Sequence, residues 1–132
     1  MKFEELRSRS RLDLEIGDEL DREAQALPKK KAQWSEWLSV YAIECKKADW
    51  AYRKIQRERF EYYYSDYHLT LDKKDIREIY LPGDDEVVEA AKRLELAKQK
   101  VELCERTIKN LTAVGFDIKN VIEYRKLMSG II

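Results

Sequence analysis

The chain has 132 residues, of which 39% are charged and only 4 are glycine and 2 proline, a composition that favours long helices over turn-rich folds. Its 26 basic and 26 acidic residues give a net charge of zero, so contact with nucleic acid would require local segregation of charge. With one histidine, His68, and two isolated cysteines, Cys45 and Cys104, the sequence lacks both a zinc-site spacing and a histidine-based catalytic constellation. We expect a soluble, intracellular, non-enzymatic protein that needs no metal or cofactor.

An acidic segment opens the chain and is expected to be helical within residues 1–28. Residues 1–24 carry five basic and eight acidic side chains, a net charge of −3. Gly17 is a candidate helix stop, and Asp18 is a candidate N-cap for the helix that follows. Pro28 either opens a helix as a first-turn residue or kinks one already running, and the pattern leaves both options open.

Residues 29–83 are expected to form a basic long helix and a connecting loop. Apolar residues recur at spacings of three and four, which is typical of a helix with one narrow apolar seam. The seam consists of Leu38, Tyr41, Cys45, Ala48, Tyr52 and Ile55. Its next position is Arg59, so we expect the seam to end there or the helix to leave the core. Residues 29–59 carry nine basic and four acidic side chains, a net charge of +5.

A second long helix and a terminal assembly helix are expected within residues 84–132. The pair Pro82–Gly83 ends a short preceding helix, and Asp84 is placed to cap the next one. Gly115 fits a left-handed C-cap, so the long helix is expected to stop there. Asp117 would then start a separate last helix.

These elements predict an all-α fold, an elongated helical hairpin with two long helices plus short helices in a single domain covering residues 1–132. So thin a protomer would leave apolar area exposed, notably at Trp34 and Trp37. Exposed apolar patches often mark self-association, so we expect a homo-oligomer. The predicted assembly residues are Phe116, Ile118, Val121, Ile122 and Arg125.

A run of cations followed by tyrosines, residues 53–65, is the strongest functional signal in the chain. Guanidinium and ammonium groups can neutralise phosphates, and tyrosine rings can stack on unpaired bases, so the run suits single-stranded nucleic acid. The same residues also fit a solvated basic helix face that ends in an aromatic cluster closing the core. The run itself leaves both interpretations open.

Four segments of the sequence, taken together, point to a known family. They are Lys31-Ala32-Gln33-Trp34, Arg57-Glu58-Arg59-Phe60-Glu61-Tyr62-Tyr63, Tyr80-Leu81-Pro82-Gly83-Asp84 and Phe116-Asp117-Ile118-Lys119-Asn120-Val121-Ile122-Glu123-Tyr124-Arg125-Lys126. In order and spacing they resemble the UvsY family of phage recombination mediator proteins, over nearly the whole chain. The family often has a glycine soon after the tyrosines, whereas Tyr64-Ser65-Asp66-Tyr67 follows here.

The resemblance implies a non-enzymatic mediator of DNA recombination, repair and replication, acting in the cytoplasm of a phage-infected bacterial host. Its partners would be single-stranded DNA, the single-strand-binding protein that coats it, and the phage strand-exchange recombinase that it helps to load. The implied assembly is a ring of roughly six or seven protomers. A different class of function also fits the residues, namely an oligomeric helical adaptor whose basic segment contacts acidic protein surfaces.

The family's basic pair before the tyrosines falls on Arg57 and Arg59. With the neighbouring cations and rings, the implied nucleic-acid-binding residues are Arg53, Lys54, Arg57, Arg59, Tyr62 and Tyr63. The tyrosines could instead pack within the structure or between protomers.

Overall fold

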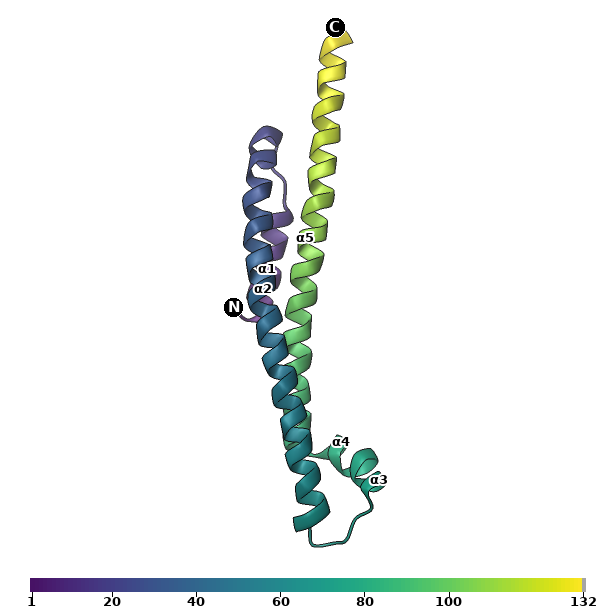
Figure 1. The fold of residues 1–132 in the computed structure, drawn as a ribbon. Helices are drawn as coiled ribbons and strands as arrows, with labels where there is room; N and C mark the ends of the chain where they lie inside the picture. The colour runs from purple at the N-terminus through teal and green to yellow at the C-terminus, as the bar shows by residue number, and fades with distance from the viewer. Residues whose placement is uncertain (132) are drawn as a thin grey trace. The chain divides into compact units, whose positions relative to one another are not determined.

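The computed structural model describes residues 1–131 and confirms the all-α prediction, since no strand occurs in that part of the chain. Its elements are α1 (Phe3–Leu14), α2 (Leu20–Glu61), the π-helical turn η1 (Tyr62–Asp66), α3 (Lys73–Asp75), a second π-helical turn η2 (Ile76–Tyr80), α4 (Leu81–Gly83) and α5 (Asp85–Ile131) (Figure 1). Among residues 1–131, none of the helices contains an apolar stretch that could span a lipid bilayer.

The chain divides into two compact units. The first comprises Met1–Val40 and the described residues from Lys100 onward, so it holds α1, the first part of α2 and the last part of α5. The second comprises Tyr41–Gln99 and holds the rest of the long helices with the connecting segment between them.

Three helices share the core of the first unit. Leu6 of α1, Trp34 of α2 and Leu111 of α5 are fully buried. A polar contact joins α1 to α5, because Ser10 and Thr107 lie 2.6 Å apart between hydroxyl oxygens. Thr107 already donates to the carbonyl of Leu103 at 2.8 Å, so Ser10 is the donor in this pair.

Trp34 corrects one prediction, because it is buried rather than part of an exposed patch. Its indole Nε1 donates to Oδ2 of Asp13 at 2.8 Å, and Lys30 donates to the Asp13 carbonyl at 3.0 Å. A buried indole N–H needs such a partner, and α1 supplies it. The sequence pattern missed this because the acceptor lies 21 positions away in the chain.

The predicted helix boundaries near residue 17 were also shifted. Helix α1 already ends at Leu14 and α2 begins at Leu20, so Gly17 and Asp18 both lie in the connection rather than at a stop and an N-cap. Pro28 lies inside α2, so it does not open a helix as a first-turn residue but stands in one that has already begun.

Gly115 does not end a helix, contrary to the prediction. Helix α5 runs without a break from Asp85 to Ile131, and none of the glycines has a positive φ. A Cβ placed on Gly115 would meet Cδ1 of Leu27 at 3.4 Å, so the residue lies where α5 approaches α2. The expected separate terminal helix is therefore the last part of α5.

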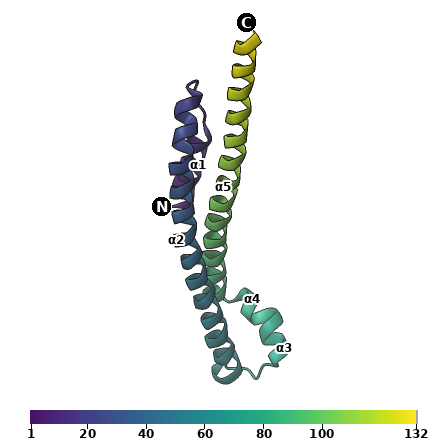
Figure 2. The ribbon, with the colours of Figure 1, turned by 45° about the horizontal axis from the view of Figure 1, so that its top comes forward.

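In the second unit, the end of α2 lies beside the start of α5, and α3, η2 and α4 form a helical arm joining them (Figure 2). Tyr41 of α2 and Val87, Ala90 and Leu94 of α5 are buried, and Ile76 of the arm is fully buried. The arm ends at Gly83, as the proline and glycine there predict.

Asp84 caps α5 as predicted. Its Oδ1 accepts hydrogen bonds from the backbone N–H groups of Glu86 at 3.0 Å and Val87 at 3.1 Å. Asp85 and Glu86 add negative charge in the first turn, where the helix dipole favours it.

Candidate nucleic-acid interface

The two arginines of the basic pair lie on different sides of α2. Successive residues of an α-helix turn by about 100°, so positions 57 and 59 are about 200° apart around the axis. Arg57 is exposed, whereas the side chain of Arg59 is only 25% exposed. The pair therefore cannot act as one surface patch.

Arg59 stands at the next position of the apolar seam and forms an ion pair with a buried carboxylate. Its Nε donates to Oδ2 of Asp84 at 2.9 Å, and the Asp84 side chain is only 4% exposed. Glu86 lies farther away, at 3.9 Å from the same nitrogen. The seam thus does not end at Arg59, because the position is filled by a cation whose partner caps the facing helix.

Tyr63 joins this ion pair, and we call Arg59, Tyr63 and Asp84 the Asp84 cluster. The hydroxyl of Tyr63 donates to the same Oδ2 of Asp84 at 2.7 Å, and its ring is half-buried against Tyr67 and Tyr80. The guanidinium of Arg59 lies 5.4 Å from the Tyr63 ring centre. One carboxylate therefore holds the end of α2, the tyrosine turn and the start of α5 together.

The pKa values in the cluster agree with that geometry. Burial acts to raise the pKa of Asp84, but hydrogen bonds from Tyr63, the Val87 amide and Arg59 outweigh it and lower the pKa below its ordinary 3.8. The hydrogen bond to Asp84, with burial, raises the pKa of Tyr63 above 10.0. Asp84 is thus held as a carboxylate, and Tyr63 as its donor.

The opposite face of α2 is exposed and cationic. Arg53, Lys54 and Arg57 surround a shallow hollow together with Trp50, whose side chain is 64% exposed. Arg53 and Lys54 make only exposed ion pairs along the helix, with Asp49 at 3.2 Å and Glu58 at 3.9 Å. Within the described chain no carboxylate pairs with Arg57.

Lys46 and Lys47 extend this face by one turn. Both are exposed, and they lie four and three positions before Trp50. We call Lys46, Lys47, Trp50, Arg53, Lys54 and Arg57 the outer face of α2. Residues at such spacings share one side of a helix, so the outer face presents five cations around one tryptophan.

An aromatic group follows the outer face toward the end of α2. Phe60 and Tyr64 stack with ring centres 6.2 Å apart, and Tyr64 is 54% exposed. Cations from the arm cover both rings, with Lys73 5.3 Å from the Tyr64 ring centre and Arg77 5.8 Å from that of Phe60.

The predicted binding residues therefore separate into two groups. Arg53, Lys54 and Arg57 lie together on the outer face, while Arg59 and Tyr63 belong to the Asp84 cluster. Tyr62 lies at the edge of that cluster, half-exposed at 37%, with the Arg59 guanidinium 4.3 Å from its ring centre.

Two aromatic residues with suitable exposure were missed, Trp50 and Tyr64. Trp50 stands at i−3, i−4 and i−7 from the three cations of the hollow, a spacing that would have identified it. Tyr64 was not among the predicted binding residues, because the sequence gives no sign of which of the three adjacent tyrosines is exposed. The π-helical turn η1 begins at Tyr62, and in it Tyr63 is half-buried whereas Tyr64 is exposed.

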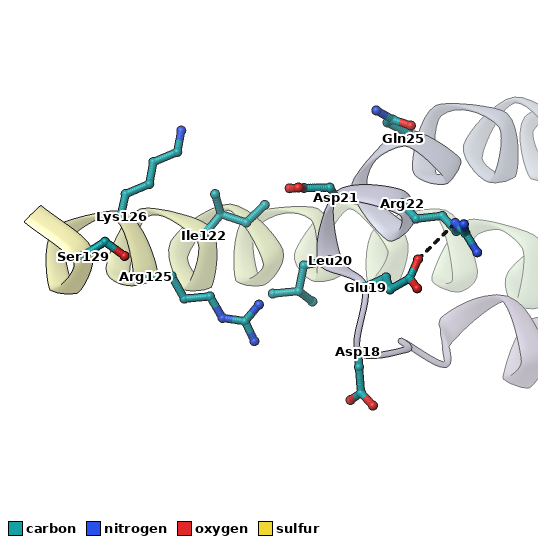
Figure 3. Close-up of a pocket in the computed structure, with 10 residues that line it drawn as sticks. All are labelled: Asp18, Glu19, Leu20, Asp21, Arg22, Gln25, Ile122, Arg125, Lys126 and Ser129. Atoms are coloured by element: carbon teal, nitrogen blue, oxygen red, sulfur yellow. Dashed lines mark ion pairs between the residues drawn. The ribbon is translucent and has the colours of Figure 1, made fainter.

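The predicted assembly residues also differ in exposure. Ile118 is buried within the first unit, whereas Phe116 is 63% and Val121 42% exposed. Ile122 and Arg125 line an open hollow whose other wall is the start of α2 (Figure 3).

That hollow has an acidic and a basic side. Asp18, Glu19 and Asp21 lie on one side with Arg22, which pairs with Glu19 at 3.2 Å. Arg125 and Lys126 lie on the other side, with Leu20 and Ile122 between the two. Its surface is mixed in charge, unlike the outer face of α2.

Within residues 1–131, no group of histidine, cysteine, aspartate or glutamate side chains is arranged to hold a metal ion. Cys104 is buried, with a pKa raised to about 11 chiefly by burial, and Cys45 is half-buried; both are free thiols. The main polar features of the second unit are the Asp84 cluster in its interior and the cationic outer face of α2 on its surface.

Comparison with known proteins identifies the family. A family model described as "Recombination, repair and ssDNA binding protein UvsY" matches residues 6–131. Among solved structures, the crystal structure of the bacteriophage T4 recombination mediator protein UvsY is similar, with a TM-score of 0.87 and 19% identity over 98% of each chain. At that identity the likeness concerns the fold. No curated protein sequence matches the chain. Because the family model covers nearly all of the sequence, the protein belongs to the UvsY family.

Proposed function

We propose that the protein is a recombination mediator that binds single-stranded DNA through the outer face of α2. The observation that carries this proposal is the side-by-side placement of Arg53, Lys54 and Arg57 around an exposed tryptophan. Exposed cations beside an aromatic ring combine the two elements of sequence-tolerant single-strand binding, which are phosphate neutralisation and base stacking.

Family membership supports the wider role. The family is described as acting in recombination and repair, and the similar T4 protein is described as a recombination mediator. For this chain we infer that it engages single-stranded DNA coated by a single-strand-binding protein and assists loading of a strand-exchange recombinase in a phage replication system.

Assembly into a ring would strengthen the binding. One protomer offers five cations on its outer face, so tight binding to a long strand would come from several protomers acting together. The exposed Phe116 and Val121 are the apolar side chains that we assign to contacts between protomers.

The test begins with a labelled single strand titrated with the protein at several salt concentrations, beside a duplex of equal length. We expect preference for the single strand and a logarithmic affinity that falls linearly with the logarithm of salt concentration. Arg57→Ala should weaken binding, while Arg93→Ala, which removes an exposed arginine of α5, serves as the matched control. Equal affinity for the two forms of DNA, or equal effects of both substitutions, would contradict this assignment.

The mediator role needs a separate assay. Strand exchange by a phage recombinase on DNA coated with its single-strand-binding protein should be accelerated by the wild-type protein and less so by Arg57→Ala. Strand binding without any acceleration would leave a DNA-binding protein that is not a mediator.

A further inference from the structure

We propose that Trp50 is the platform on which one unpaired base of the bound strand stacks. The inference rests on the proposed function, because it names the residue that would distinguish a single strand from other polyanions. Neither the family description nor the basic run pointed to this residue.

The exposure of Trp50 is the first reason. Tryptophan is among the most buried residue types on average, yet this side chain is 64% exposed on the outside of α2. The other two tryptophans contrast with it: Trp34 is fully buried, and its ring lies 4.8 Å from that of Trp37 in an edge-on pair. In the described chain the Trp50 ring has no aromatic or cationic partner.

The placement of cations around the ring is the second reason. Lys46 and Lys47 precede Trp50 by about one turn, and Arg53 and Lys54 follow it by about one turn. With a rise of about 1.5 Å per residue, these charges lie roughly 5 Å to either side of the ring along the helix axis. A strand running along α2 could therefore place a base on the ring while its flanking phosphates meet cations on both sides.

The charge of the face argues against a second copy of the chain as its occupant. Residues 46–57 carry five basic side chains and one acidic one. A symmetric contact of this face with itself would bring like charges together around the tryptophan. A polyanion with flat apolar rings fits both properties of the face, and an unpaired stretch of DNA has both.

Stacking also explains how the face could prefer single strands. Every base has a flat surface, so one tryptophan tolerates any sequence, but it requires a base that is not already stacked and paired in a duplex. The three cations of the hollow would attract both kinds of DNA. Discrimination would thus depend on Trp50 and affinity at low salt on Arg53, Lys54 and Arg57.

The experiment compares Trp50→Ala, Trp50→Phe and the control Ile43→Ala in the full-length protein. Ile43 is 55% exposed and lies two turns before Trp50 on the same side of α2, so it controls for loss of an exposed apolar side chain. The probes are a labelled oligothymidylate and an abasic strand of equal length. Circular dichroism and light scattering measure the helicity and particle mass of each variant beside the wild type.

We expect Trp50→Ala to weaken oligothymidylate binding by roughly five-fold or more, with Trp50→Phe closer to wild type. The salt dependence should keep its slope, because no phosphate contact is lost. Binding to the abasic strand should not change, and Ile43→Ala should match wild type on both probes. Oligothymidylate should also quench wild-type tryptophan fluorescence more than that of Trp50→Phe.

The outcomes separate this inference from the proposed function. If wild-type protein fails to bind either strand, the proposed function fails. If wild type binds but Trp50→Ala binds oligothymidylate equally well, the function stands and the stacking role of Trp50 is overturned. A changed particle mass in Trp50→Ala would instead place the residue in a contact between copies and would also overturn it.

Discussion

Arg57 and Arg59 are two positions apart, yet the structure predicts opposite results when each is replaced by alanine. Arg59 pairs with a buried carboxylate inside the second unit, whereas Arg57 faces outward from α2. We expect Arg59→Ala to destabilise the fold and Arg57→Ala to weaken DNA binding with little change in stability.

The magnitude for Arg59→Ala follows from what is lost at Asp84. A hydrogen bond to a charged group contributes about 1.5–3 kcal/mol, and the side chain of Asp84 is only 4% exposed. The 25% exposure of Arg59 places the loss in the lower half of that range, because solvent screens the pair. The lost contact with the Tyr62 ring adds about 0.5 kcal/mol. We expect a total loss of about 2–3 kcal/mol.

For Arg57→Ala the corresponding loss is about 0.5 kcal/mol or less, because exposed helix positions tolerate alanine. Its effect should appear in the DNA titration instead. Removing one phosphate contact should reduce the slope of logarithmic affinity against logarithmic salt concentration by about 0.7 for a single strand.

The assay is thermal unfolding of both variants at one protomer concentration, since assembly makes the melting temperature concentration-dependent. Arg59→Ala should lower it by roughly 6–12 °C and Arg57→Ala by about 2 °C or less. A cycle with Asp84→Asn identifies the partner: once the carboxylate is neutral, Arg59→Ala should cost much less. DNA affinity is then measured well below both melting temperatures.

One combination of results would refute this reasoning. If Arg59→Ala melts like wild type but shows a reduced salt slope in DNA binding, Arg59 contacts phosphates. The ion pair with Asp84 would then not exist in the state that binds DNA.

Three further predictions concern stability, pH and assembly. Gly115→Ala should raise the free energy of unfolding by about 0.5–1 kcal/mol, measured by thermal unfolding. The reason is that Gly115 lies inside α5, where an added Cβ would meet only Leu27, at an ordinary 3.4 Å. The same substitution at a C-cap glycine would destabilise the protein. Because folding lowers the pKa of Asp84, its carboxylate contributes stability that is fully present above the ordinary pKa of 3.8 and is lost as pH falls through the pKa of the folded protein. Asp84→Asn should therefore flatten the acid side of a curve of unfolding free energy against pH. Val121→Asp should reduce the particle mass in light scattering without lowering helicity, since Val121 is 42% exposed, and an unchanged mass would remove this side chain from the assembly surface.

Much of the fold could be predicted because its strongest signals are local. The three-and-four spacing of the seam predicts α2, and an aspartate followed by acidic residues predicts the start of α5. Gly115 shows the limit of such signals. A glycine serves equally as a helix end or as a close contact between helices, and the deciding neighbour, Leu27, lies 88 positions earlier in the sequence.

The candidate site shows the same limit more sharply. Periodicity places Arg59 in the seam, and an arginine at that position predicts either that the seam ends or that the helix leaves the core. Arg59 is instead neutralised by Asp84, 25 positions later. The outer face needed no distant partner, since Trp50 and its cations follow from helical spacing. The sequence predicted three of its cations, Arg53, Lys54 and Arg57, but assigned the aromatic part of the site to Tyr62 and Tyr63 rather than to Trp50.

The Asp84 cluster and the outer face are coupled through the orientation of α2. Asp84 binds Arg59 of α2 and Tyr63 of η1 and caps α5 with the same carboxylate, which holds α2 in one rotation against α5 within the second unit. That rotation turns the seam inward and therefore turns Trp50 and Arg57 outward. If the outer face binds DNA as proposed, we expect a substitution at Arg59 to weaken that binding without contacting DNA, because it loosens the rotation that turns the outer face outward. Loss of binding in such a variant identifies a DNA contact only when stability and salt slope have been measured with it.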